Sequence, residues 1–281
     1  MANFFLAYDA STHGDWVAHY AARIVSQCAE RTLHVVHVQD GRRSVSDCQI
    51  GLQHLQAESR RLKVELQVLE VPMQVSVEHT ICNTVPRGPD SVLICGTRGR
   101  ERSRGLFTGS LSERMLRLCH CRMLAIHVAL PGLLGAPRRL LLPVSGHPRG
   151  FCHGLPFLKM LARDAAELHL LFVEPVSRRR LRLLSGSAVE SLKTAGREYC
   201  RRIEAEILTE LPSSPSLLDA LVTVSDNVPR EIVVAASRLH AQLILLGASE
   251  RHLTERILHG NPIEQVLRTA TCDVAIYRGV T

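Results

Sequence analysis

The sequence lacks the features that mark membrane-spanning and secreted proteins. No apolar run reaches the ~18 residues that a membrane-spanning helix needs. The first residues, "MANFFLAYDAS", have no basic segment before their apolar stretch and turn polar too early for a signal peptide. We therefore expect a cytoplasmic protein without a membrane partner.

Paired cysteine motifs are also missing. The nine cysteines are odd in number and scattered, and no C-x-x-C occurs. The one tight group is "CHC" at Cys119–Cys121, without matching ligands elsewhere at metal spacing. This pattern predicts reduced, buried thiols rather than a disulfide framework or a zinc site.

Aromatic residues and lysines are scarce. Phe, Trp and Tyr make up 4% of the chain, and Lys63, Lys159 and Lys193 are its only lysines, although its net charge is +7. Arginine therefore supplies nearly all the positive charge, and its guanidinium suits bidentate contact with phosphate or carboxylate. Basic residues do not interleave with aromatic ones as base-stacking surfaces require, so nucleic acid is not an expected partner.

The sequence also lacks familiar catalytic motifs. It has no G-x-S-x-G elbow, no H-E-x-x-H and no P-loop lysine. His13 follows the first predicted strand and is a candidate for a phosphate contact, whereas His34, His37 and His127 lie within strand patterns. No catalytic residue is assigned.

What the chain does contain is an internal repeat. Matching segments lie at offsets of 135, 143 and 151 residues, and the last offset continues through Cys121 and Cys272. A period this long indicates duplicated domains, which we place at residues 1–132 and 137–281, with a Pro- and Gly-containing linker. The matched pairs are Leu33–Asp40 with Leu168–Pro175, Asn83–Arg87 with Asp226–Arg230, and Val92–Gly96 with Leu243–Gly247.

Each copy alternates short Val/Ile/Leu runs with helical patterns. This alternation predicts α/β domains with five-stranded, mainly parallel sheets of the doubly wound, Rossmann-like class. Predicted strands of the first copy are Phe4–Tyr8, Leu33–Val38, Met73–Val77, Ser91–Cys95 and Met123–Val128, and predicted helices are Gly14–Glu30, Cys48–Glu70 and Ser110–Cys119. Predicted strands of the second copy are Arg139–Val144, Glu167–Val173, Leu217–Val224, Leu243–Gly247 and Val274–Tyr277.

One helix differs between the copies. The second copy has a helical pattern over Pro229–Gln242, whereas only Pro86–Asp90 stands between the corresponding points of the first. We therefore expect the helix before the glycine loop to be nearly absent from the first copy.

The glycine loop itself, "GTRGRERSRGLFTGS" (Gly96–Ser110), joins a predicted strand to a predicted helix. Glycines let a backbone approach phosphate closely, and a helix start offers free N–H groups to an anion. Ser110 with Glu113 also forms a capping box, which needs no ligand to justify it. The loop thus has both a binding and a purely structural interpretation.

The spacing Gly96-x2-Gly99-x9-Gly109-Ser110 resembles the nucleotide-binding signature of the universal stress protein family, and the resemblance extends over both copies. It implies two tandem domains of the adenine nucleotide alpha hydrolase-like type, and ATP or a related adenine nucleotide in the first. The residues it assigns to the nucleotide are Asp9, Val38, Gly96, Arg98, Gly99, Gly109, Ser110 and Leu111.

In that assignment, Asp9 contacts ribose or the adenine edge, and Val38 contacts adenine through its main chain. Gly96 and Gly99 pass under the ribose and phosphates, and Arg98 adds a charge. Gly109, Ser110 and the Leu111 N–H hold the terminal phosphates. Mg²⁺ or Mn²⁺ is expected to arrive with the nucleotide, and Arg100, Arg102 and Arg104 lie in the variable part of the loop.

The second copy departs from the signature. Ser145 replaces Asp9, Glu250 replaces the middle glycine and Asn261 replaces the serine. A carboxylate where phosphate oxygens should pass is repulsive, so the resemblance implies nucleotide binding by the first domain only. A second basic run, Ser177–Ser187, is expected to be an exposed, mobile segment.

The expected function is that of a nucleotide-binding stress-response protein that acts through conformation or partners. Two alternatives remain, a scaffold that binds no nucleotide and a weak ATPase. Family members pair through the last strand of each domain. The tandem is therefore expected to imitate such a dimer, and a homodimer or a regulatory protein partner is possible.

Overall fold

The fold was examined in a computed structural model of the chain. It describes residues 2–41, 45–97, 109–133, 136–145, 151–163, 165–211, 217–248 and 261–280. Within these residues, no helix is long and apolar enough to cross a membrane.

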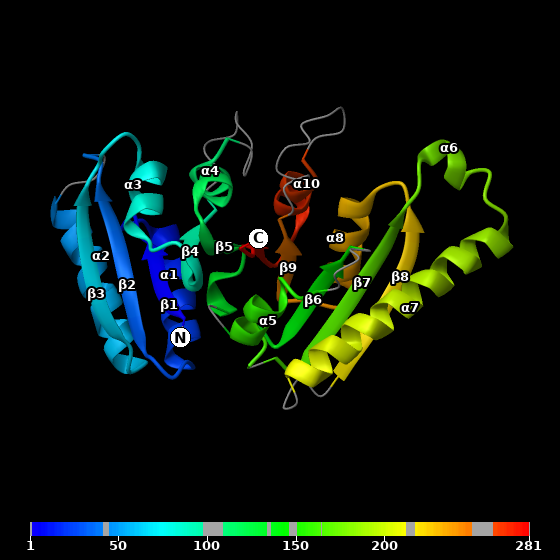
Figure 1. Cartoon of the computed structure of the whole chain (residues 1–281), viewed down its shortest axis with the longest axis horizontal. Helices are drawn as coiled ribbons and strands as arrows, with labels where there is room; N and C mark the ends of the chain where they lie inside the picture. Colours follow the sequence, from blue (N-terminus) through cyan, green and yellow to red (C-terminus); the bar gives the residue numbers. More distant parts are fainter. Residues whose placement is uncertain are drawn as a thin grey trace.

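All ten strands belong to one continuous sheet with the order β3-β2-β1-β4-β5-β10-β9-β6-β7-β8 (Figure 1). Neighbouring strands run parallel within each half, and β5 and β10 join the halves as an antiparallel pair. The strands are β1 (Asn3–Ala7), β2 (Thr32–Gln39), β3 (Glu65–Pro72), β4 (Gly88–Gly96), β5 (Cys121–His127), β6 (Arg139–Val144), β7 (Glu167–Pro175), β8 (Leu217–Ser225), β9 (Leu243–Gly247) and β10 (Asp273–Arg278). The predicted fold class, two tandem doubly wound domains, is confirmed.

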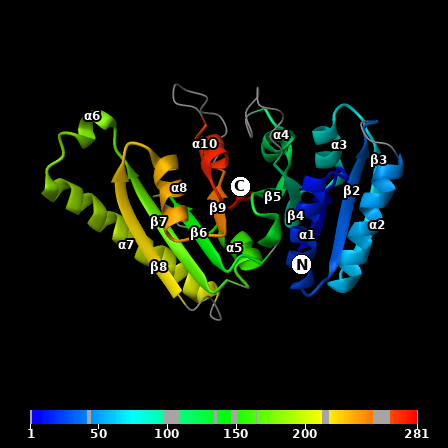
Figure 2. The same ribbon diagram turned by 180° about the vertical axis from the view of Figure 1, so that it is seen from behind.

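Helices cover both faces of the sheet, as the opposite views show (Figures 1 and 2). The buried apolar residues form two cores. The helices that contribute to the first core are α1 (Thr12–Ser26), α2 (Val45–Arg61), α5 (Leu155–Leu161) and α7 (Gly186–Glu210). Those whose buried residues join the second core are α3 (Val77–Thr84), α4 (Leu111–Leu118), α8 (Val228–Arg238) and α10 (Pro262–Thr269). The short helix α6 (Arg178–Leu181) buries none of its side chains, and Pro131–Leu133 forms a 3₁₀ turn.

The two halves are related by an approximate two-fold axis through the central strand pair. Ala125 lies opposite Ile276, which is its own counterpart at the 151-residue offset. Opposition of equivalent residues is what a two-fold interface requires. The expectation that the tandem imitates a dimer within one chain is therefore confirmed.

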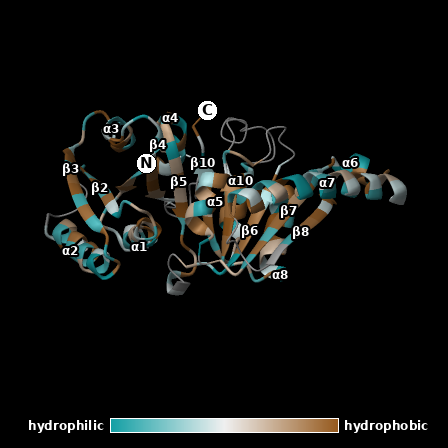
Figure 3. Ribbon diagram, turned by 60° about the horizontal axis from the view of Figure 1, so that its bottom comes forward, coloured by the Kyte–Doolittle hydropathy of each residue, from teal (hydrophilic) through white to brown (hydrophobic). Residues whose placement is uncertain are grey.

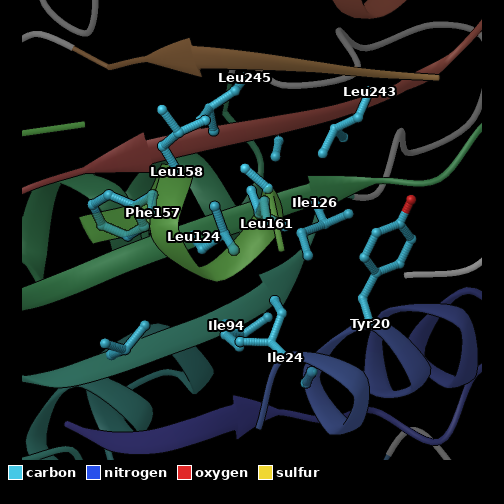
Figure 4. Packing of buried hydrophobic residues seen from close by; sticks show 14 of the residues in the cluster. Tyr20, Ile24, Ile94, Leu124, Ile126, Phe157, Leu158, Leu161, Leu243 and Leu245 are labelled. Atoms are coloured by element: carbon cyan, nitrogen blue, oxygen red, sulfur yellow. The ribbon is translucent and has the colours of Figure 1, made fainter. Parts of the chain in front are cut away.

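The first core continues across the junction without a break. Figure 4 shows Leu124 and Ile126 of the first half near Leu161 of the second, and Leu158 and Leu243 belong to the same cluster. Burial of apolar surface contributes about 25 cal/mol per Å², so this shared core holds the halves together.

Buried polar contacts also join the halves. The fully buried Asp273 of β10 accepts hydrogen bonds from the Tyr20 hydroxyl of α1 and from the N–H groups of Ala129 and Leu130, at 2.8 and 2.9 Å for the latter two. Arg278 donates to the carbonyls of Leu116 and Cys119 at the end of α4. Each half thus completes the hydrogen bonding of the other.

The third strand and the helix after it differ from the prediction. The predicted strand Met73–Val77 is wrong, because the third strand, β3, occupies Glu65–Pro72. Most of these residues had been predicted as the end of the helix Cys48–Glu70, which is therefore too long. The first copy also has a helix before its glycine loop, because α3 spans Val77–Thr84. The expected loss of that helix is wrong.

The offsets of 135, 143 and 151 predict that the second copy carries extra residues both before and after its VPR, about seven and about eight, and this prediction is wrong. Leu33 pairs with Leu66, and its counterpart Leu168 pairs with Leu218, so the offset rises from 135 to 152 between these strands. "NTVPR" ends α3, whereas "DNVPR" begins α8. The extra residues therefore all precede β8, and the VPR match is not a structural equivalence.

One pair of cysteines corrects the expectation of reduced thiols throughout. Cys82 of α3 and Cys119, which caps the end of α4, form a disulfide. The sequence interpretation had no helix at Cys82 and so could not place it beside α4. Several other thiols are buried, and burial raises the pKa values of Cys121, Cys200 and Cys272 to about 11, which keeps them protonated at neutral pH.

Candidate functional site

The register of the sheet brings three predicted site residues to one edge. Ala7 lies opposite Val36, and Leu6 lies opposite Ile94. The ends of β1, β2 and β4 are therefore level, with Asp9, Val38 and Gly96 around them. In parallel sheets, this carboxyl edge is where ligands bind.

Asp9 is exposed and is held in place by the turn that follows β1. Its Oδ1 accepts hydrogen bonds from Ser11 N at 3.1 Å and from Ser11 Oγ at 2.6 Å. Ser11 Oγ in turn caps α1 by accepting from Gly14 N at 2.9 Å. The carboxylate is therefore positioned at the start of a helix and also remains accessible.

Two residues of this turn were missed by the sequence analysis. Ala10 has a φ of +52°, a left-handed conformation that costs a residue with a Cβ about 1–2 kcal/mol. A Cβ on Gly14 would lie 2.5 Å from Asp9 Oδ1. Gly14 is therefore required for the close approach of Asp9 to α1, and no motif in the sequence signals this contact.

The main chain of Val38 points toward the space beyond β1. The N–H of Tyr8 donates to the carbonyl of Val36, so the alternation of a strand directs the N–H and C=O of Val38 to the same side. The carbonyl of Tyr8, which would continue the ladder, instead contacts Nδ1 of the buried His37 at 3.0 Å. Val38 thus presents its backbone at the edge where Asp9 lies.

Packing explains in part why residue 96 is a glycine. An added Cβ would lie 3.1 Å from His13 Nδ1 and 3.3 Å from Val17 Cγ2. His13, in the first turn of α1, has Trp16 and His127 as ring neighbours, with centroids 5.9 and 6.1 Å away. The structure thus brings His13 to the candidate site, beside the end of β4.

The start of α4 shows both the predicted cap and an added contact. Gly109 has a φ of +76°, which favours glycine. Ser110 Oγ accepts from Glu113 N at 3.1 Å, and the Glu113 carboxylate accepts from Gly109 N and pairs with Arg117 at 2.7 Å. One donor that the resemblance assigned to phosphate is therefore used by Glu113.

Two other donors at this helix start have no recorded partner among the residues that the structure describes. Among the hydrogen bonds between described residues, none uses the N–H of Leu111 or Ser112. These are first-turn amides, which have no partner within a helix. In the second half, the residue equivalent to Leu111 is Pro262, which has no N–H.

Arg98 and Gly99 lie outside the described residues, as do Arg100, Arg102 and Arg104. The structure therefore tests neither their predicted contacts with the nucleotide nor the course of the loop between Thr97 and Gly109. In the second half, Glu250 is likewise outside the described residues.

In the second half, aromatic side chains crowd the equivalent edge. Tyr277 stacks on Phe157 and meets Phe151 edge-on, with ring centroids 5.2 and 6.0 Å away. A Cβ on Gly247, the counterpart of Gly96, would lie 2.9 Å from the Tyr277 hydroxyl oxygen. The position equivalent to Tyr277 in the first half is Ile126.

Ser145, which replaces Asp9, is tied to a helix through its main chain. The hydroxyl of Tyr199 in α7 donates to the carbonyl of Ser145 at 2.5 Å. The second half therefore has a serine in place of the Asp9 carboxylate, and at Pro262 it has no N–H in place of the Leu111 amide.

Two doubly wound domains, paired through their last strands, define a class of tandem Rossmann-like proteins. The sequence model of the universal stress protein family matches residues 1–127 and again residues 137–278. The chain belongs to the universal stress protein family, in its tandem form.

Solved structures agree on the fold. A universal stress protein from Archaeoglobus fulgidus is 14% identical, with a TM-score of 0.65 over 99% of this chain and 97% of that one. A protein of unknown function from Pseudomonas aeruginosa is 18% identical, with a TM-score of 0.60 over 98% and 92%. The cytoplasmic domain of a prokaryotic cation chloride cotransporter is 11% identical, with a TM-score of 0.57 over 100% and 96%. No curated protein matches the chain.

Proposed function

We propose that the first domain binds an adenine nucleotide, with ATP as the reference ligand, at the carboxyl edge of β1, β2 and β4. The observation that carries the proposal is the meeting of Asp9, the Val38 main chain and the start of α4 around this edge. The protein then acts as a stress-response regulator whose conformation or partners change with the bound nucleotide.

The phosphate end lies at the start of α4. The first-turn N–H groups of Leu111 and Ser112 supply donors, and the helix dipole favours an anion there. The Glu113 carboxylate is paired with Arg117, which offsets its negative charge near the phosphates. Arg98 and Gly99 are proposed to complete the cradle.

The nucleoside end lies beside Asp9 and Val38. The accessible Asp9 carboxylate is an acceptor for ribose hydroxyls, and the Val38 N–H and C=O can hydrogen-bond the adenine edge. Trp16, the chain's one tryptophan, lies beside His13, which in turn contacts the position of Gly96, so its fluorescence can report on binding.

The second domain is proposed to bind no nucleotide. Pro262 lacks the N–H that Leu111 offers, and Tyr277 occupies the space beside Gly247. This domain instead contributes Asp273 and Arg278 to the first.

The divalent ion is proposed to enter with the nucleotide. Among the described residues, no group of three or more His, Cys, Asp or Glu side chains could hold a metal. Phosphate oxygens would therefore supply most ligands to Mg²⁺ or Mn²⁺. We propose a binding protein rather than an enzyme and assign no catalytic residue.

Leu111→Pro tests the phosphate end with little disturbance of the fold. Proline is well tolerated at the first position of a helix, and Ser110, with φ −73° and ψ 164°, already has the extended conformation that a residue before proline adopts. The substitution removes one N–H. Leu111→Ala is the matched control, because it removes the same side chain and keeps the N–H.

Calorimetric titration with ATP and Mg²⁺, together with Trp16 fluorescence, measures the outcome. Loss of a hydrogen bond to a charged group costs about 1.5–3 kcal/mol, so Leu111→Pro should weaken binding roughly 10- to 100-fold relative to Leu111→Ala. Equal affinities for the two variants would remove α4 from the proposed site. Absence of binding to the wild-type chain would refute the proposal as a whole.

A further inference from the structure

The second domain carries a projection that its nucleotide-binding counterpart lacks. We call residues Ser177–Ala195 the arginine arm; it consists of α6, the link to α7 and the first ten residues of α7. None of the buried side chains of α7 precedes Gly196. Figures 1 and 3 show α6 and the start of α7 at the end of the molecule opposite α2.

The arm accounts for most of the length difference between the domains. α7 has 25 residues, whereas its counterpart α2 has 17, and α6 has no equivalent among the described residues between β2 and α2. The core of the second domain does not include these residues, because the buried residues of α7 begin at Gly196.

The arm is strongly basic. Arg178, Arg179, Arg180 and Arg182 are all exposed, and none of the ion pairs recorded between described residues includes them. The arm's one carboxylate, Glu190, is already paired with Lys193 and Arg197, at 3.1 and 3.3 Å. Four arginine charges are therefore available to an anionic partner.

Leucines accompany these arginines at the tip. Leu183 is 85% exposed, the largest exposed fraction of any large apolar side chain among the described residues, and Leu181 and Leu184 are only half-buried. Arg178, Arg179, Arg182 and Leu183 line one shallow, open depression. The surface thus combines guanidinium groups with an apolar tip.

This combination selects one class of partner. Single-stranded nucleic acid would stack on aromatic side chains, and none occurs between Ser177 and Glu198. The buried centre of a protein interface is mostly apolar, whereas Leu183 is the arm's one exposed large apolar side chain. Anionic lipid headgroups attract arginines, and the boundary with the acyl chains accepts leucine.

We propose that the arginine arm attaches the protein to the surface of an anionic lipid bilayer. The four arginines contact the headgroups, and Leu183 inserts at the boundary between the headgroups and the acyl chains. Surface attachment needs no membrane-spanning helix. This proposal departs from the expectation that the protein has no membrane partner. The sequence alone did not reveal that the basic run Ser177–Ser187 lies on a projection. The sequence predicted that this run is exposed, and the exposed arginines confirm that part of the expectation.

Co-sedimentation of the full chain with vesicles tests the proposal. The probes are vesicles of phosphatidylcholine alone and vesicles containing phosphatidylglycerol in addition. The arm variant carries Arg178→Gln, Arg179→Gln, Arg180→Gln and Arg182→Gln. The matched control carries Arg31→Gln, Arg60→Gln, Arg61→Gln and Arg87→Gln, four exposed positions of the first domain with the same charge change.

The wild-type chain and the control variant should sediment with anionic vesicles and not with neutral ones. Each arginine near an anionic membrane surface raises the affinity for that surface about fivefold. The arm variant should therefore bind anionic vesicles on the order of a hundredfold more weakly, or weaker still, than the wild-type chain. A Leu183→Trp variant should show a blue shift of its added fluorescence with anionic vesicles only.

Three results would overturn the proposal. The first is that the wild-type chain does not bind anionic vesicles. The second is that the arm and control variants lose the same amount of affinity for these vesicles. The third is that the fluorescence of Leu183→Trp is not shifted under conditions where the protein sediments with them. The second of these would mean that the net charge of +7 alone attracts the chain. Circular dichroism of each variant checks that the fold is kept.

Discussion

At the scale of single residues, the candidate site depends on a close contact between a carboxylate and a glycine. Asp9 is placed by Ser11 and by the absence of a side chain at Gly14. This contact has no signature in the sequence, because it depends on how the turn after β1 returns to α1. Asp9 itself could be predicted, since it ends an apolar strand pattern in a family-like position.

Gly14→Ala tests that contact. The new Cβ would lie 2.5 Å from Asp9 Oδ1, so the carboxylate must turn away from its place. We expect ATP affinity to fall about tenfold or more, the cost of one charge-assisted hydrogen bond. The thermal midpoint should hardly change, because alanine is the better helix former.

The matched control is Gly186→Ala, which also adds a Cβ near a helix start, where no atom lies within 4 Å. Calorimetry and thermal unfolding of both variants give the answer. Unchanged ATP affinity in Gly14→Ala would mean that the position of Asp9 does not matter for binding.

At the scale of elements, the strands buried on both faces and the edge strand β8 were predictable, whereas the edge strand β3 was not. β2 and β4 are nearly continuous apolar runs, whereas in β3 exposed and half-buried residues mix, with Glu65, Gln67 and Glu70 among its side chains. Its leucines also fit helical spacing with those of α2. Because β3 was read as helix, α3 and its contact with α4 were missed, and the disulfide with them.

The disulfide between α3 and α4 makes its own prediction. It closes a loop of 37 residues that contains β4, the glycine loop and α4. Removing such a cross-link through Cys82→Ser should lower the free energy of unfolding by about 2–4 kcal/mol, measured by urea denaturation without reductant. In the wild-type chain, added reductant should have the same effect.

Cys152→Ser, at an exposed free cysteine, is the control and should leave stability unchanged. Mass spectrometry of the unreduced wild-type digest should find the Cys82 and Cys119 peptides joined. Finding both thiols alkylated in the unfolded, unreduced chain would contradict the assigned cross-link.

At the scale of the whole molecule, the tandem behaves as one body because each half completes the other. The sequence repeat predicted two domains, and the family resemblance suggested pairing through their last strands. The polar contacts across the junction could not be foreseen, because Asp273 and Arg278 have no equivalents at Arg122 and His127. They break the symmetry that the repeat implies.

Asp273→Ala tests this mutual dependence. The substitution leaves the Tyr20 hydroxyl and the N–H groups of Ala129 and Leu130 without their buried acceptor. We expect a loss of about 3 kcal/mol or more in the free energy of unfolding. The exposed Asp226→Ala serves as control, with a change within about 0.5 kcal/mol. Equal stability of the two variants would show that the junction does not rely on Asp273.

The central claim is that the tandem holds one adenine nucleotide, in its first domain. The most direct test denatures freshly purified protein after incubation with ATP and Mg²⁺ and counts the released nucleotide per chain by ion-pair chromatography with mass spectrometry. The account predicts a value close to one, lost in Leu111→Pro and kept in Leu111→Ala. A value of two would contradict the claim for the second domain, and a value of zero would contradict it for the first.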